Sequence, residues 1–139
     1  MAALLALLAV LAAAGVGVAW HRGDGTTKRG SGERIRPSEV ALPDDSFGPR
    51  GTLLLFTAEH DVRSAEVRRA LEEAAAAVPG VRIATVDLGR RGDLAGRYAV
   101  TAIPTVFVLD ADGRLRFRMK GAARPADVLA ALQDATPGP

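Results

Sequence analysis

The distribution of apolar residues divides the chain into three parts. Residues 1–20 form an almost uninterrupted apolar run without a charged side chain. Residues 21–41 are rich in Gly, Ser, Thr and charged residues, a composition typical of a linker. From residue 42 to 135 short apolar segments alternate with polar breaks, as in a single folded domain. We therefore expect a transmembrane anchor at 1–20, a flexible basic linker at 21–41 and a globular domain at 42–135.

The apolar run is long enough to cross a membrane. A helix rises about 1.5 Å per residue, so this run spans a hydrocarbon core of about 30 Å. Trp20 lies where the run meets a basic flank, as an interfacial aromatic residue does. No Lys or Arg precedes the run, which argues against a cleaved signal peptide, although the Ala-rich end leaves cleavage open. Because the basic flank of a membrane span usually remains in the cytoplasm, we expect a single-pass membrane protein with a cytoplasmic domain. An exported domain is the alternative.

The periodicity of the domain predicts strand, helix, strand, and then helix, two strands and helix. The continuous apolar run at 52–56 is typical of a strand buried on both faces. A helix follows from an N-cap at Asp61 to Val78, with an apolar stripe at every third to fourth residue. The pattern also predicts strand 81–87, short helix 91–98, strand 105–109, an Asp-Gly turn at 110–113, a return strand and a last helix from Pro125.

These elements predict an α/β fold with a central mixed sheet flanked by helices. The return strand alternates apolar and basic residues, so one set is expected to face the core and the other solvent. The expected inward residues are Leu115, Phe117 and Met119, and the expected outward residues are Arg114, Arg116 and Arg118.

Charge and cysteine content exclude several function classes. The chain carries a formal charge of +2, but the surplus lies between residues 21 and 36 and the domain is nearly neutral. A basic nucleic-acid footprint is therefore not expected, and no nucleic-acid partner is predicted. The chain has no cysteine, so it cannot form a disulfide, build a cysteine metal site or use a thiolate nucleophile.

Three segments resemble the thioredoxin family in the expected order. FTAEHDVRSAEVRRAL at 56–71 is similar to the active-site segment in which an Ala-Glu pair and a tryptophan lead into CGPC and its helix. RYAVTAIPTVFVLDADGRL at 97–115 is similar to the stretch with the cis-proline and the hairpin, and MKGAARPADVLAAL at 119–132 to the glycine and closing helix. The resemblance implies a thioredoxin-like fold with a cis bond before Pro104. The apolar and basic N-terminal parts resemble membrane-tethered thioredoxin-family proteins of high-GC bacteria.

The resemblance also shows what is missing. Asp61 and Ser64 stand at the two cysteine positions of the family, and neither a carboxylate nor a hydroxyl can form a disulfide. Leu55 stands where the family has a buried proton-handling aspartate, and His60 stands where it has a tryptophan. No catalytic residue and no dithiol oxidoreductase activity are therefore expected.

Other chemistry at these positions is weakly supported. Asp61 is interpreted as a helix cap. Glu59, His60 and Asp61 are potential metal ligands, but consecutive residues do not readily converge on one ion, so neither a metal nor a cofactor is expected. Ser64 and His60 lack an assured orienting carboxylate, which disfavours a hydrolase.

Peptide binding is the function that the resemblance leaves open. In the family, the backbone before the cis-proline pairs with an extended peptide, and this needs no cysteine. We expect a non-catalytic protein-binding, peptide-binding or scaffold module; the alternatives are a redox-pathway component that acts without its own dithiol, or a decayed paralogue. Pro104 could also do no more than shape its turn. The candidate groove residues are His60, Asp61, Ser64, Ala102, Ile103, Pro104 and Gly121.

Overall fold

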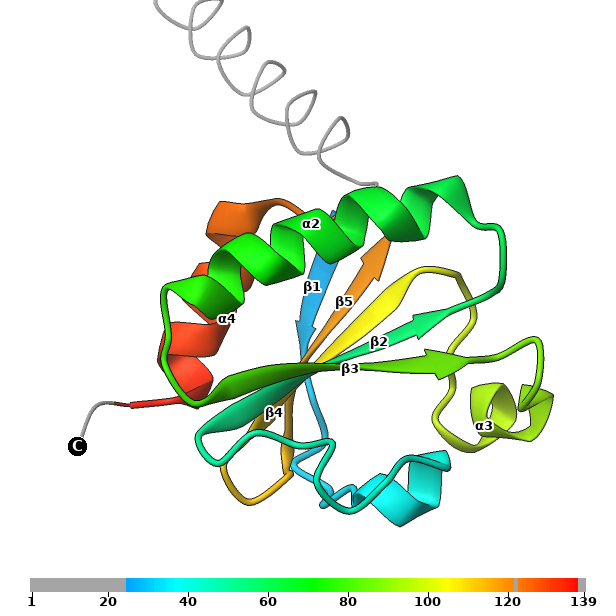
Figure 1. The fold of residues 1–139 in the computed structure, drawn as a ribbon, viewed down its shortest axis with the longest axis horizontal. Coiled ribbons are helices and arrows are strands. Elements are labelled where there is room, and N and C mark those ends of the chain that lie inside the picture. Colours follow the sequence, from blue (N-terminus) through cyan, green and yellow to red (C-terminus); the bar gives the residue numbers. More distant parts are fainter. Residues whose placement is uncertain (1–24, 122, 138–139) are drawn as a thin grey trace, which may run out of the picture.

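The computed structural model describes residues 25–121 and 123–137, which form a five-stranded mixed sheet with helices on both faces (Figure 1). The strand order is β1-β5-β4-β2-β3, in which β2 and β3 are parallel and the other neighbours antiparallel. The predicted α/β architecture is confirmed. The elements are β1 (Gly25–Arg29), the 3-10 helix η1 (Pro37–Val40), β2 (Gly51–Thr57), α2 (Val62–Ala76), β3 (Val81–Asp87), α3 (Gly92–Arg97), β4 (Thr105–Asp110), β5 (Leu115–Gly121) and α4 (Pro125–Ala135).

Two apolar clusters lie on opposite faces of the sheet. In β2, Leu53 and Leu55 pack on the side of α2 and α4, whereas Leu54 and Phe56 pack on the side of α3 and η1. All four side chains are fully buried, because successive residues of a strand point to opposite faces and both faces are covered. The predicted apolar stripe is confirmed, since Val67, Leu71 and Ala74 of α2 are buried, and Val78, two residues beyond the end of the helix, is buried as well.

The expectation of a flexible linker is wrong for residues 25–41. β1 pairs with β5 in antiparallel register from Gly25↔Gly121 to Arg29↔Phe117, and η1 follows it. Ile35 and Val40 are each 1% exposed within the core cluster on the α3 side. β1 joins the sheet through backbone hydrogen bonds and carries polar side chains, so it leaves no hydrophobic period in the sequence.

The alternation predicted for β5 holds only in part. Leu115 packs in the cluster on the α3 side, whereas Phe117 and Met119 pack on the α2 and α4 side. The register between β4 and β5 shifts between Val108 and Leu109, and such a bulge reverses which side chains share a face. Arg118, expected to face outward, is half-buried on the α3 side.

The predicted transmembrane anchor, residues 1–20, lies outside the described residues. Within 25–121 and 123–137, no helix has the length and apolar character that a membrane span requires.

Candidate functional site

The candidate groove residues gather at the sheet edge where β2 ends and β4 begins. Phe56 and Thr105 lie opposite each other in the antiparallel ladder, so the loop after β2 and the loop before β4 leave the sheet as neighbours. Figure 1 shows the loop that enters β4 near the N-terminal end of α2. Gly121 reaches the same edge, because its backbone N–H donates to the carbonyl of Pro104 at 2.9 Å.

Asp61 caps α2, as predicted. Its backbone is extended, with φ −80° and ψ 113°, and its Oδ1 accepts from the backbone N–H of Arg63 at 2.9 Å. The carbonyl of Asp61 accepts from the N–H of Ser64 at 3.2 Å. Such a cap contributes about 1 kcal/mol to stability. The carboxylate can accept further hydrogen bonds, because an ionised carboxylate offers two oxygens.

Ser64 lies behind the cap and its hydroxyl is engaged. The residue is 8% exposed, and its Oγ accepts from the hydroxyl of Thr57 at 2.5 Å. His60 instead points away from the protein: its side chain is 90% exposed and its Nε2 lies 3.6 Å from Glu59 Oε1. Within the described ranges no hydrogen bond joins Ser64 to His60, so the two do not form a nucleophile and base.

The loop between α2 and β2 takes a sharp turn at His60. The φ of His60 is 68°, in the left-handed region that non-glycine residues seldom adopt. The turn orients Glu59 and His60 toward solvent while the next residue caps the helix. In the part of the chain that the structure describes, no three His, Cys, Asp or Glu side chains converge as metal ligands.

The loop before β4 exposes main-chain hydrogen-bonding groups beside the capped helix. The Ile103–Pro104 bond is cis, as the resemblance implies. Thr105 Oγ1 donates to the carbonyl of Ala102 at 2.7 Å and fixes the loop. Neither the N–H nor the carbonyl of Ile103 bonds to another described residue, while its side chain packs against the α3-side core. An extended segment could therefore pair with Ile103 by main-chain hydrogen bonds.

The position at which the thioredoxin family has a buried aspartate is occupied here by a buried leucine. Leu55 has 0% exposure and lies in an aliphatic cluster with residues of β2, α2 and α4. Leucine carries no transferable proton, and a carboxylate at this position would be removed from solvent and surrounded by apolar side chains.

Comparisons with known proteins agree with this architecture. The sequence matches the thioredoxin-like domain family over residues 48–136, and no protein with a curated description matches it. Chloroplastic thioredoxin z is similar at a TM-score of 0.58 and 20% identity, over 76% of this chain and 95% of that one. Mitochondrial thioredoxin 3 of Saccharomyces cerevisiae is similar at a TM-score of 0.53 and 26% identity, over 61% of this chain and 78% of that one. Fasciola hepatica thioredoxin is similar at a TM-score of 0.52 and 23% identity, over 63% of this chain and 83% of that one. The chain belongs to the thioredoxin-like domain family, without the cysteines of its redox motif.

Proposed function

We propose that the domain binds an extended segment of a partner protein in the groove at the N-terminus of α2 and does not catalyse thiol–disulfide exchange. The observation that carries this proposal is that neither main-chain group of Ile103 has a hydrogen-bond partner in the described part of the chain. An N–H and a carbonyl at one residue match the hydrogen-bonding groups of an added strand. The candidate groove residues remain His60, Asp61, Ser64, Ala102, Ile103, Pro104 and Gly121, with His60 at the solvent-exposed rim and Ser64 buried behind the cap.

The residues at the motif positions suit binding better than catalysis. Disulfide exchange requires a thiolate that attacks and a second thiol that resolves, and the chain contains neither. Asp61 keeps a negative charge at the helix N-terminus and has an oxygen free of the Arg63 hydrogen bond, which can accept from a partner N–H. The groove would therefore hold a peptide without reacting with it.

We further propose that residues 1–20 anchor this module in a membrane, with the domain on the cytoplasmic side. The support is the apolar run, Trp20 at its end and the basic flank after it. A reporter enzyme that works only outside the cytoplasm, fused to the C-terminus, is expected to be inactive. An active reporter would reverse the orientation.

Site-specific crosslinking in the native cell tests the groove. A photoreactive residue in place of the exposed His60 is expected to capture a partner, whereas the same residue in place of Asp112, at the hairpin between β4 and β5, is not. Asp61→Arg is expected to lower capture about tenfold or more, because a hydrogen bond to a charged group is lost and a long cation enters the groove. Capture is measured from the intensity of the crosslinked band.

Two further variants separate binding from folding. Asp61→Asn keeps the cap and an acceptor oxygen but not the charge, so its stability should remain close to that of the natural chain and its capture should fall less than that of Asp61→Arg. Asp61→Ala removes the cap and should lower the free energy of unfolding, measured by urea denaturation, by about 1 kcal/mol. This value shows how much of the stability loss in Asp61→Arg comes from the missing cap alone. Undiminished capture by Asp61→Arg, or reduction of insulin disulfides by the natural chain above background, would contradict the proposal.

A further inference from the structure

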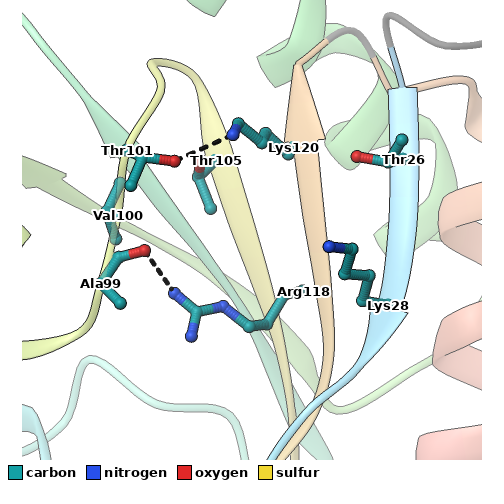
Figure 2. A pocket seen from close by; sticks show the side chains of 8 residues that line it. All are labelled: Thr26, Lys28, Ala99, Val100, Thr101, Thr105, Arg118 and Lys120. Carbon is teal, nitrogen blue, oxygen red and sulfur yellow. Dashed lines mark hydrogen bonds between the residues drawn. The ribbon is translucent and has the colours of Figure 1, made fainter.

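A cavity lies between β1, β5 and the loop before β4, and it adjoins the candidate groove through Thr101, Thr105 and Lys120. Its volume is about 220 Å³, and Figure 2 shows three cationic side chains that extend from the two strands toward that loop. Among residues 25–121 and 123–137, none of those that line it is acidic. They are Thr26, Lys28, Ala99, Val100, Thr101, Thr105, Arg118 and Lys120.

The sheet register places like charges opposite each other in this cavity. Lys28 on β1 pairs directly with Arg118 on β5, and Thr26 pairs with Lys120 two residues along. Lys120 in turn pairs with Thr105 on β4, so one row across the three strands carries a hydroxyl, a cation and a hydroxyl. The row of Lys28 and Arg118 ends on β4 at Phe107. Like charges directly opposite in a sheet are destabilising, so an anion between them would stabilise this arrangement.

The contacts of the three cations leave their charge uncompensated. The guanidinium of Arg118 lies 4.7 Å from the centre of the Phe107 ring and donates to the carbonyl of Ala99 at 3.0 Å. Lys120 Nζ donates to Thr101 Oγ1 at 2.9 Å. These partners are neutral, and the structure gives Lys28 no ion pair among residues 25–121 and 123–137. The packing of Arg118 holds its charge in place in the absence of a ligand.

We propose that this cavity binds a phosphate group. A phosphate has several acceptor oxygens and up to two negative charges, which match three cationic donors and the hydroxyl of Thr101. Because Thr101 Oγ1 accepts from Lys120, its own proton is available to a ligand. The cavity is open to solvent at the exposed ends of Lys28 and Lys120, so the group that carries the phosphate can extend outward.

The phosphate could come from a soluble phosphorylated molecule or from an anionic lipid headgroup. β1 begins at Gly25, close in sequence to the end of the proposed anchor at Trp20. Lysine and arginine near an anionic bilayer surface are attracted to its phosphates, so the lipid source requires the anchor, whereas the soluble source does not. Neither source requires the peptide groove.

The binding test is an amide NMR titration of the full chain in zwitterionic micelles. Inorganic phosphate is expected to give saturable shifts at the residues that line the cavity, and sodium chloride of equal ionic strength is not. Lys28→Gln and Lys120→Gln are each expected to weaken binding about fivefold, the effect of one charge at about 4 Å in water. Arg29→Gln removes the same charge from the opposite face of β1 and is expected to leave binding unchanged.

A charge reversal keeps the test independent of folding defects. Lys28→Glu places a carboxylate opposite Arg118, so it should raise the Tm without phosphate and abolish the phosphate-dependent rise in Tm. The site is overturned if chloride reproduces the shifts, or if Lys28→Gln, Lys120→Gln and Lys28→Glu all bind phosphate as the natural chain does.

Lipid nanodiscs distinguish the two sources. Shifts at the cavity that appear with phosphatidylglycerol but not with phosphatidylcholine alone, in the absence of free phosphate, would assign a lipid headgroup. Shifts that need added phosphate in both nanodiscs would assign a soluble ligand. Absence of cavity shifts under every condition would overturn the proposal.

Discussion

Leu55→Asp is expected to destabilise the domain by about 4 kcal/mol or more at neutral pH, and the loss is expected to grow with pH. Leu55 is completely buried within an aliphatic cluster. The substitution removes about 1.5–3 kcal/mol of apolar burial and places a carboxyl group where no cation or water can compensate for it. Since domains of this size are stable by about 5–15 kcal/mol, a large fraction of the protein is expected to unfold on mild heating.

The pH dependence follows from the direction in which burial shifts the pKa of the carboxyl group at position 55. Burial raises the pKa of a carboxyl group above its unfolded value of about 3.9, so the folded variant binds more protons than the unfolded one. Stability relative to a non-titrating variant is therefore highest below pH 4 and falls by up to about 1.4 kcal/mol per pH unit until the folded pKa is passed.

Leu55→Asn is the matched control, because asparagine has nearly the same shape but does not titrate. Urea denaturation between pH 4 and 8 measures the difference in free energy of unfolding between Leu55→Asp and Leu55→Asn. If this difference does not change with pH, the carboxylate has a partner or water in the core. The natural chain would then retain a place for a proton-transferring group, and the account of Leu55 as a dry position would be wrong.

The sequence predicts those parts of the fold in which apolar residues recur at regular spacing along the chain. The run at 52–56 is almost the whole of β2, and the stripe on α2 and the turn at Gly113 are where the pattern indicates. Gly113 has a φ of 79°, which the Asp-Gly signal anticipates. These elements bury their own side chains, so local sequence and tertiary packing specify the same structure.

β1 could not be predicted, because its stability comes from a partner remote in sequence. Its side chains Thr26, Thr27, Lys28 and Arg29 are exposed, and only pairing with β5 holds it in the sheet. The cavity proposed to bind phosphate leaves no sequence signal for the same reason, since it forms only when Lys28 lies opposite Arg118. The capping role of Asp61, by contrast, depends on residues two positions apart and is readable from the chain.

The double variant Asp61→Cys/Ser64→Cys is expected to gain disulfide-reducing activity that the natural chain lacks. The two positions are the N-cap and the third residue of α2, so their side chains lie about 5–6 Å apart and can be bridged by a small movement. The helix N-terminus lowers the pKa of a thiol below its usual value of about 8.5 and so favours the attacking thiolate. Position 64 is 8% exposed, which protects the second thiol until a mixed disulfide forms.

Thiol titration before and after oxidation, followed by an insulin reduction assay, measures this gain. Because the chain has no other cysteine, any loss of free thiols reports the new pair alone. Asp61→Cys by itself is expected to form a mixed disulfide with the substrate and not to turn over, since it lacks a resolving thiol. Turnover by the double variant but not by the single variants would mean that the chain lost redox function through two side chains on an intact scaffold. A folded double variant that forms no disulfide would show instead that the start of α2 differs from a redox site in its backbone, and the groove built on that backbone would need to be reconsidered.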